Sequence, residues 1–337
     1  MIMEARARQC AARLLEDRGT PPDAACLQAD VLIEAELRGL PSHGLLRLPR
    51  LLARIDKGLA VPAAVGLHHW RTTAVLEVDG QRALGPIAMM AALEAMMPRL
   101  QVAGIALAAI RNANHIGMLA YYAEQAAARG VIGIVLSTSE ALVHPYGGTQ
   151  AMLGTNPIAI GIPTADEPFV LDLATSLVSM GKIHSHALRG EPLSDGWAVD
   201  SSGRPTTDAL AAKHGAIAPF GQAKGYGLGL AFELLVAALA GSDLAPAIRG
   251  TLDASEPANK GDLLILIDPG TRDGLAAGLT EYLNAIRASR PLHPDRPVAV
   301  PGDGARHRRI AALRDGIDIP AALLDELQRV GGDCKWT

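Results

Sequence analysis

The sequence is poor in cysteine and has no excess of positive charge. Cys10, Cys26 and Cys334 are the only cysteines among 337 residues, and their spacing fits neither a disulfide framework nor a metal site. Such a low and odd number is typical of a reducing compartment, so we expect a cytoplasmic protein without a bound metal. The net charge of −4 and the isoelectric point near 6.2 indicate no basic surface, and we expect no nucleic-acid partner.

Long apolar runs without charges are also missing. The most apolar helix candidate, residues 226–241, has 16 residues and contains Glu233, whereas a membrane-spanning helix needs about 20. The amino terminus carries charges throughout and lacks the apolar core of a signal peptide. Apolar residues make up 49% of the chain, which is ordinary for a globular protein. We therefore expect a soluble protein with no membrane partner, long enough for two domains.

The third absence concerns nucleotide-binding motifs. No GxGxxG lies between a predicted strand and a helix, and the stretch PFGQAKGYG at residues 219–227 is not a P-loop because no Ser or Thr follows Lys224. Glycines before an apolar helix let backbone amides approach a phosphate, but they equally allow close helix packing. A dinucleotide bound by this chain is therefore not held in the usual Rossmann manner.

What the sequence does contain is a strand–helix–strand pattern in its middle. Residues 102–110 and 131–136 are apolar runs typical of strands buried on both faces, and residues 118–129 between them are rich in alanine. Such a unit is nearly always parallel, so both strands end at the same edge of the sheet, where ligands gather. We therefore expect His115 and residues 137–139, which follow the two strands, to lie together at a cleft.

Other segments are read in the same way. Residues 191–222 are rich in turn residues without helical periodicity, and a loop of this length is often functional. The remaining predicted elements are helices in residues 3–40, 85–100, 224–241, 273–290 and the last thirty residues, and strands in residues 73–78, 158–162, 169–173 and 263–268.

Two short stretches carry candidate catalytic side chains. His115 lies between Asn112–Ala113–Asn114 and the predicted helix, and a histidine exchanges protons near neutral pH, although it also serves as a helix cap. Ser42 is a candidate N-cap for a helix on which His43 and Arg47 share a face, with a kink or a new helix start at Pro49. Arg47 is suited to bind a carboxylate, but a solvated arginine on a capped helix is the simpler interpretation.

A third histidine stretch has a weaker case. His184 and His186 flank Ser185 in a segment that reads as helical, where two histidines two residues apart do not face the same side. Neither has an acidic or cysteine partner at a metal-ligand spacing. We expect both to be exposed to solvent.

Five blocks in one order resemble a known enzyme family. PSHGLLRLPR, NANHIGMLAYYAEQAAARGVIGIVLSTS, HPYGGTQAMLGTNPIAIGIPT, FVLDLATSLVSMGK and APFGQAKGYGLGL are similar to blocks of the malate/L-lactate dehydrogenase-like oxidoreductases. That group includes sulfolactate, ureidoglycolate and diketogulonate dehydrogenases, and reductases of cyclic imino acids such as piperideine-2-carboxylate and pyrroline-2-carboxylate. The resemblance runs over residues 8–330, and it is more specific for the family than for the substrate.

The resemblance implies an α/β fold of the sulfolactate dehydrogenase-like type, distinct from Rossmann, in which a mixed sheet holds NAD or NADP and a homodimer surrounds the active site. It implies a helical amino-terminal region and a discontinuous substrate-side domain, residues 1–115 with 295–337, beside an NAD(P)-binding domain, residues 116–294. His43 and His115 would be the candidates for proton transfer, with Ser42 beside them. Arg47 would bind the substrate carboxylate, near Thr155 and Asn156. The cofactor would be lined by His115, Ile116, Gly117, Met118, Leu119, Ser137, Asp172, Leu173, Ala174, Lys224, Gly225, Pro301, Gly302, Asp303 and Arg306.

Two departures from the family pattern affect these assignments. Some cyclic-imine reductases of the group complete a Ser–His–acid relay with an acidic residue shortly after the fourth block, where this chain has Lys182. The family turn Pro-Gly-Glu is here Pro301-Gly302-Asp303, with a shorter acid. It precedes a basic run at residues 306–309, which favours NADPH, although NADH remains an alternative because Asp303 is suited to a free ribose hydroxyl.

The sequence therefore predicts an NAD(P)-dependent oxidoreductase. We expect it to transfer a hydride between the nicotinamide and a small 2-oxo or 2-hydroxy acid, with a histidine as proton donor or acceptor. Reduction of a cyclic imino acid is the alternative within the family. A hydrolase triad of Ser42, His43 and Asp172 is disfavoured because no G-x-S-x-G motif occurs and His43 directly follows Ser42.

Overall fold

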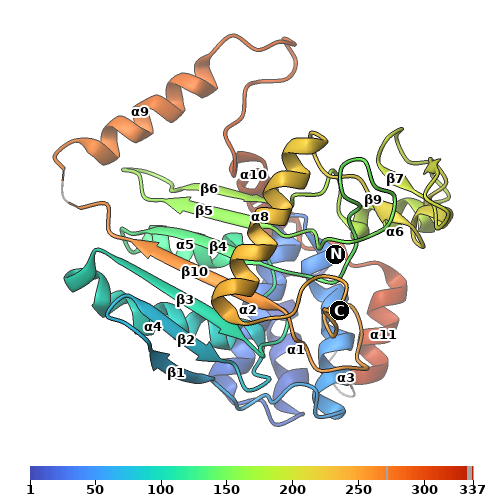
Figure 1. Cartoon of the computed structure of the whole chain (residues 1–337), viewed down its shortest axis with the longest axis horizontal. Helices are drawn as coiled ribbons and strands as arrows, with labels where there is room; N and C mark the ends of the chain where they lie inside the picture. Colours follow the sequence, from blue (N-terminus) through green and yellow to red (C-terminus); the bar gives the residue numbers. More distant parts are fainter. Residues whose placement is uncertain (271, 332–335, 337) are drawn as a thin grey trace.

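A computed structural model describes residues 1–270, 272–331 and 336 of the chain. Its centre is a mixed seven-stranded sheet, with α4 and α5 packed on one face and α8 crossing the other (Figure 1). The sheet confirms the predicted mixed α/β class. Its strands, in the spatial order β1-β2-β3-β10-β4-β5-β6, are β1 (Leu67–Trp70), β2 (Val75–Asp79), β3 (Ile105–Arg111), β10 (Gly261–Ile267), β4 (Ile132–Ser137), β5 (Ile158–Ile162) and β6 (Phe169–Leu173).

The strand–helix–strand unit folds as expected in direction but not in neighbourhood. β3 and β4 both pair antiparallel with β10, so they run in the same direction and end at the same edge of the sheet. β10 nevertheless separates them, so the two predicted strands are not neighbours. The sequence gives no local signal for this insertion, because β10 lies more than 120 residues further along the chain.

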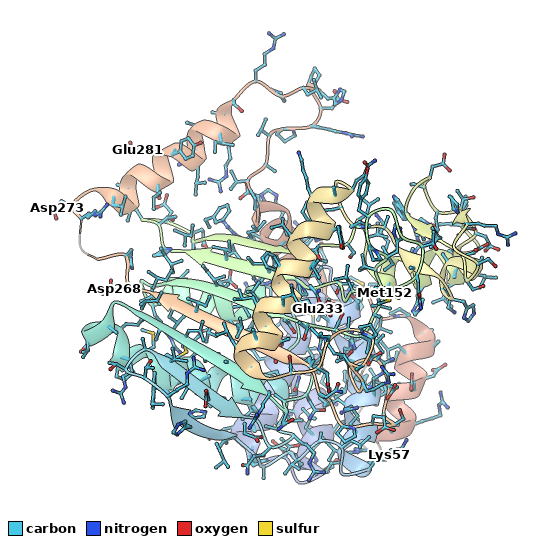
Figure 2. The ribbon with its side chains drawn as sticks, viewed as in Figure 1. Lys57, Met152, Glu233, Asp268, Asp273 and Glu281 are labelled. Carbon is cyan, nitrogen blue, oxygen red and sulfur yellow. The ribbon has the colours of Figure 1, made fainter. Side chains whose placement is uncertain are left out.

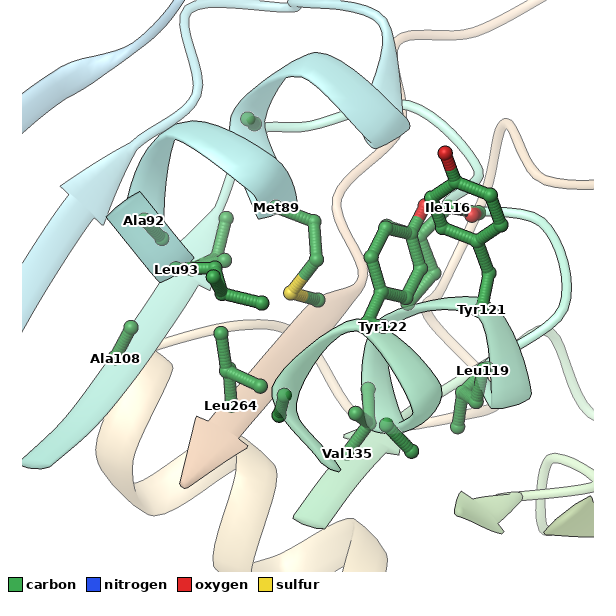
Figure 3. Packing of buried hydrophobic residues seen from close by; sticks show 14 of the residues in the cluster. Met89, Ala92, Leu93, Ala108, Ile116, Leu119, Tyr121, Tyr122, Val135 and Leu264 are labelled. Atoms are coloured by element: carbon green, nitrogen blue, oxygen red, sulfur yellow. Dashed lines mark hydrogen bonds between the residues drawn. The ribbon is translucent and has the colours of Figure 1, made fainter. Parts of the chain in front are cut away.

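Alternation along the central strands divides the core into two layers. Ala108, Ile110 and Leu264 face α4 and α5, where they pack with Met89, Leu93, Tyr122 and other buried side chains of one large cluster (Figure 3). Ala109 and Leu263, one residue away, face α8 in a second cluster. Because successive residues of a strand point to opposite faces, a central strand covered on both sides must be apolar throughout.

The amino- and carboxyl-terminal helices pack together beside the sheet. Buried side chains from α1, α2, α3 and α11 form a separate core cluster. Strands β1 to β3 belong to the same sheet as β4 to β6, so the sheet is continuous across residue 115, where we predicted a domain boundary. The terminal helices are α1 (Glu4–Glu16), α2 (Pro22–Leu37), α3 (Leu48–Asp56), α10 (Asp303–Asp315) and α11 (Ala321–Gly331). The two helices on the face of the sheet are α4 (Gly85–Ala103) and α5 (Ala120–Ala128).

The tract predicted to be a loop is a small folded unit. Residues 191–222 contain a second sheet in the order β8-β7-β9, formed by β8 (Pro205–Thr206), β7 (Ala198–Val199) and β9 (Ala216–Ile217). Helices α6 (Met180–Arg189) and α7 (Ala209–Ala212) pack on it around the buried Ile183. Each strand has only two residues, too few for a periodic pattern, which explains why the sequence reads as a loop.

Helix α8 (Ala223–Ala240) has 18 residues and lies within one residue of the predicted bounds 224–241. Its length and composition alone would allow it to cross a membrane. Within the protein, 28% of its residues are buried. Its buried residues, including Glu233 and Val236, form one stripe along the helix against the sheet. Leu228, Leu234 and Leu235 remain between 43% and 52% exposed.

Helix α9 (Leu275–Ala288) and the chain after it extend away from the body as an arm (Figure 1). Asp273 and Glu281 mark the arm in Figure 2, and Asp268 marks the end of β10 from which the arm departs. All of α9 is described, and none of its residues is buried.

The cysteines differ from expectation. Cys26 is free and exposed, but Cys10 is disulfide-bonded, so the prediction that none of them pairs is wrong. Spacing along the chain does not reveal which cysteines tertiary packing brings together.

Candidate active site

The segment between α2 and α3 carries Ser42, His43 and Arg47. It forms two short 3-10 turns, Pro41–His43 and Leu45–Arg47, instead of the predicted helix, and α3 begins at Leu48. Ser42 does not cap a helix, because its Oγ lies 3.1 Å from His43 Nδ1. A hydroxyl both donates and accepts hydrogen bonds, so this contact is compatible with either protonation state of the His43 ring.

His115 lies in the loop that follows β3 and faces His43. The two ring centroids are 5.5 Å apart with an interplanar angle of 36°. The backbone N–H of Gly117 donates to His115 Nδ1 at 3.0 Å, so Nδ1 is an acceptor and the neutral ring carries its proton on Nε2. Protonation of Nδ1 would place two donors against each other, so this contact favours the neutral ring.

Burial lowers the pKa of both histidines. The pKa of His43 falls to about 4, first because the ring loses contact with water and then because Arg47 is near. The pKa of His115 falls well below its ordinary value for the same first reason, with further repulsion from Arg47 and His43. Both rings are therefore neutral at neutral pH in the ligand-free protein.

Arg47 is fixed by backbone carbonyls. Its Nε donates to Ser42 O at 2.8 Å and its Nη1 to Thr251 O at 2.9 Å. Burial lowers its pKa to about 10, helped by the neighbouring Arg50 and opposed by Glu140. Among the described residues no carboxylate contacts the guanidinium directly, although Glu140 acts on its charge from nearby, and Nη2 has no hydrogen bond, which suits it to an anionic ligand.

A small cavity of about 30 Å³ is lined by Arg47 and His115, whereas Ser42 and His43 are not part of its wall. It is large enough for a single water molecule, and two buried polar atoms on residues of its wall have no hydrogen-bond partner: Gln28 Oε1 and Arg54 Nη2. Arg54 is anchored by Asn114 Oδ1 at 2.8 Å and by the carbonyls of Asp253 and Glu256. The wall is formed by Gln28, Leu32, Arg47, Arg50, Leu51, Arg54, Asn114, His115, Gly117, Gly250 and Thr251.

A second, larger cavity of about 450 Å³ lies where α5, β6 and α10 meet. Its size is ordinary for a site that holds a small organic ligand. Three arginines, Arg38, Arg306 and Arg308, contribute to its wall together with the first residues of α5 and α10. Four predicted cofactor residues line it as well: Asp172, Pro301, Gly302 and Arg306.

The two acids at this cavity have different surroundings. Asp172 Oδ2 accepts the Ala120 N–H at the start of α5 at 2.8 Å, and the cavity wall limits its hydration enough to raise its pKa to about 6. Asp303 accepts from Arg287 of α9 at 2.9 and 2.8 Å and from the Val300 N–H at 3.0 Å. Arg287 foremost lowers the pKa of Asp303 to about 2. Both oxygens of Asp303 thus bind the protein itself rather than facing the cavity freely.

Several other predicted residues lie away from both cavities. Asn156 is fully buried, and its Nδ2 donates to Gly229 O and Glu233 Oε2 of α8, while Thr155 O accepts from Thr175. Ser137 donates to Asp262, which pairs with the buried Lys260. The side chains of Ile116, Met118 and Leu119 are in the core, so only their backbone is available to a ligand. Leu173, Ala174, Lys224 and Gly225 also belong to neither wall.

Sequence reasoning missed several residues of the two walls, among them Gln28, Arg38, Arg50 and Arg54. Arg50 and Arg54 follow Arg47 at the spacing i+3 and i+7, which places three arginines on one helical face, so a periodicity signal was present. Gln28 and Arg38 gave no such signal and come to the cavities only because α2 packs beside the sheet. Arg308 belongs to the basic run at residues 306–309, which the sequence did indicate.

The remaining candidate stretch has no metal site. His184 is exposed, and His186 packs against Trp197 with its ring 5.4 Å away, as Lys182 does from 4.5 Å. Across the part of the chain that the structure describes, no group of three or more His, Cys, Asp or Glu residues is arranged to hold a metal ion.

Comparison with known proteins shows to which family the chain belongs. The model of the malate/L-lactate dehydrogenase family matches residues 2–328. The L-sulfolactate dehydrogenase of Methanocaldococcus jannaschii is 34% identical over 94% of this chain and 92% of its own. A Delta(1)-pyrroline-2-carboxylate/Delta(1)-piperideine-2-carboxylate reductase of Pseudomonas aeruginosa is 34% identical over 95% and 96%. The crystal structure of a dehydrogenase from Sinorhizobium meliloti is 63% identical, covers 98% of each chain and has a TM-score of 0.96. The chain therefore belongs to the malate/L-lactate dehydrogenase family, and it is an oxidoreductase.

Proposed function

We propose that this protein is an NADP(H)-dependent oxidoreductase that interconverts a small 2-oxo acid and its 2-hydroxy acid. The observation that carries the proposal is the ring contact between two neutral histidines, His43 and His115, beside Arg47, which lines the small cavity together with His115. A carbonyl carbon that accepts a hydride needs a proton for its oxygen, and its neighbouring carboxylate needs a fixed cation. Both requirements are met within one group of side chains.

In this proposal Arg47 binds the carboxylate of the substrate. Its two anchoring hydrogen bonds leave Nη2 as a donor toward the cavity, and Arg50 and Arg54 add positive charge to the same wall. A carboxylate held in this way keeps the reacting carbon at a fixed distance from the histidines, which is where most of the rate advantage of an oriented reaction arises.

His43 is the residue that exchanges the proton, and His115 donates a fixed hydrogen bond. Ser42 supports both protonation states of His43, whereas the Gly117 N–H favours the neutral ring of His115. Neutral His43 is ready to accept a proton from a hydroxyl. Loss of water is the main cause of the lowered pKa of His43, and a substrate carboxylate on Arg47 would offset only the smaller cause, the repulsion from Arg47.

The residues of the larger cavity fit a nicotinamide dinucleotide. Arginine side chains and the amino termini of two helices suit phosphate groups, and no Rossmann glycine motif is needed for this arrangement. Three arginines, and an Asp303 whose carboxylate is occupied by Arg287, favour the 2′-phosphate of NADPH over a free ribose hydroxyl. When bound, the cofactor supplies or accepts the hydride.

Reduction of a cyclic imino acid is the second candidate. It is favoured by the relative named as such a reductase and by the Ser42–His43 pair, which would serve a ring nitrogen as well as an oxygen. Lys182, which stands where some of these reductases have the acid of the relay, carries an ammonium group that lies over the Trp197 ring. Gly181 beside it is the residue that approaches Ser42, since a methyl group there would come within 2.9 Å of Ser42 Cβ.

The proposed assembly is a homodimer. Support comes from the arm, which has no buried residue in α9 and exposes Tyr282 at 66%, and from the exposed leucines of α8. Apolar surface of this extent is usually covered by a partner. Sedimentation at two or more protein concentrations tests this proposal, and a monomer throughout would contradict it.

One experiment tests the function directly. Turnover is followed by nicotinamide absorbance with NADPH and NADH against a panel of 2-oxo acids and cyclic imino acids. We expect turnover of 2-oxo acids with NADPH. Turnover of cyclic imines alone would select the second candidate, and no turnover of either class would contradict both.

A further inference from the structure

Glu36 of α2 lies directly beneath the turn that separates His43 from Arg47. Its Oε1 accepts the Leu45 N–H at 2.6 Å. Leu45 opens the second 3-10 turn, where the first N–H groups have no partner within the turn. A side chain from another helix therefore satisfies the start of this turn.

Gly44 is the residue that makes this approach possible. A methyl group at position 44 would overlap the carboxyl group of Glu36. The acid thus contacts the backbone at the one position in the segment that has no side chain. Leu45, the next residue, is fully buried in the core of the helical region, so the contact fixes both the backbone and its packing.

The helix that carries Glu36 is itself held firmly. Glu34, two residues before Glu36 in the same helix, accepts hydrogen bonds from Arg8, Arg38 and Arg309 and so joins α1, α2 and α10. Glu36 therefore connects the backbone of this segment to a rigid element, whereas the backbone N–H groups of His43, Gly44 and Arg47 donate to carbonyls within residues 40–44.

We propose that Glu36 is a positioning residue that sets the separation between His43 and Arg47 through its hydrogen bond to the Leu45 N–H. It touches neither substrate nor cofactor. The inference rests on the proposed function, since it assigns Glu36 a role in placing the proton-exchanging ring relative to the carboxylate-binding arginine. An acceptor oxygen is what the contact requires, and negative charge is not.

The test compares Glu36→Gln with Glu36→Ala in the full-length protein. Glutamine keeps an acceptor oxygen, so kcat should stay within about 3-fold of wild type. Alanine removes it, and kcat should fall by about 10–100-fold, because small misplacements of reacting groups have effects of this size. The Kd for NADPH should be unchanged in both variants, since the larger cavity lies elsewhere.

Asp30→Ala is the matched control. Asp30 is on the same helix, and its carboxylate accepts from Arg8 and Tyr121 but belongs to neither cavity wall. It should lower the melting temperature as Glu36→Ala does while leaving kcat near wild type. An equal loss of kcat in Asp30→Ala, an unchanged kcat in Glu36→Ala, or a loss in Glu36→Gln as large as in Glu36→Ala would each overturn the proposal.

A second readout needs no substrate and so separates this inference from the proposed function. The imidazole NMR signal of His43, identified by its disappearance in His43→Ala, should shift in Glu36→Ala and remain in place in Glu36→Gln and Asp30→Ala. An unshifted signal in Glu36→Ala would overturn the positioning role even if no substrate were turned over.

Discussion

Each of the two cavities has three arginines in its wall, but the hydrogen-bond partners of these arginines differ. In the small cavity Arg47 and Arg54 donate to backbone carbonyls and to an asparagine, so their charge is oriented without being cancelled. In the large cavity Arg38 pairs with Glu34 and Glu124, and Arg306 lies near Asp303. A guanidinium that donates to backbone carbonyls is fixed in position and keeps its positive charge for an anionic ligand. A guanidinium paired with a carboxylate must exchange that partner for the ligand. We therefore expect the small cavity to bind one anionic group strongly and the large one to make several weaker contacts.

The largest effect expected from this comparison is at His43. His43→Ala should lower kcat by about 10²–10⁴-fold, the usual contribution of a general acid or base, with little change in the Kd for NADPH. His115→Ala should act mainly on KM, because this ring provides a hydrogen bond without changing its protonation. His68→Ala, on the edge strand β1, is the control for losing an imidazole. Near-full turnover in His43→Ala would move the proton exchange to another group.

Arg47→Lys should have the next largest effect, although the charge is kept. A lysine has no planar fork, so it cannot hold two carbonyls and a carboxylate at once, and the substrate KM should rise by about 10–100-fold. The KM for NADPH should change little. Arg129→Lys, which alters an ion pair with Glu94 far from both cavities, is the comparison variant. An unaltered substrate KM would place the carboxylate elsewhere.

A smaller effect is expected in the large cavity. The wild type should have a higher kcat/KM with NADPH than with NADH, and Arg306→Ala should reduce that ratio by roughly 3–10-fold, as expected for one partly hydrated contact. His307→Ala on the same helix, exposed and outside the cavity wall, should leave the ratio unchanged. A wild-type preference for NADH would contradict the assignment of these arginines to a phosphate.

The last prediction concerns the pH dependence of stability rather than turnover. Burial raises the pKa of Glu36 to about 7, so the native protein favours its neutral form. The unfolded chain loses this proton near pH 4.5 and the native protein only near 7, so wild-type stability falls as the pH rises between these values. Glutamine does not titrate. Glu36→Gln should therefore gain on the order of 1–3 kcal/mol relative to wild type between pH 4.5 and 8, measured by urea unfolding. A difference independent of pH would show that Glu36 does not titrate in this range.

Many of the helices and strands could be predicted from the sequence because they depend on local hydrophobic patterns. The strands at residues 158–162 and 169–173 have the predicted bounds, and α4 and α9 differ from prediction by three residues or fewer at each end. The small sheet and the two 3-10 turns were missed. Strands of two residues and turns of three are too short to carry a period, and their geometry depends on neighbours such as Glu36 and Gly181.

By itself the sequence predicted the apolar central strands, because hydrophobic periodicity is a property of adjacent residues. The resemblance of five sequence blocks gave the family and, through it, the candidates His43, His115 and Arg47. Tertiary structure alone decided that β10 separates β3 from β4, that Arg54 and Gln28 join Arg47 at one cavity, and that Asp303 binds Arg287. These are contacts between segments far apart in the chain. A carboxylate or a guanidinium has the same composition whether it meets a ligand or another side chain, and only packing determines which partner is within reach.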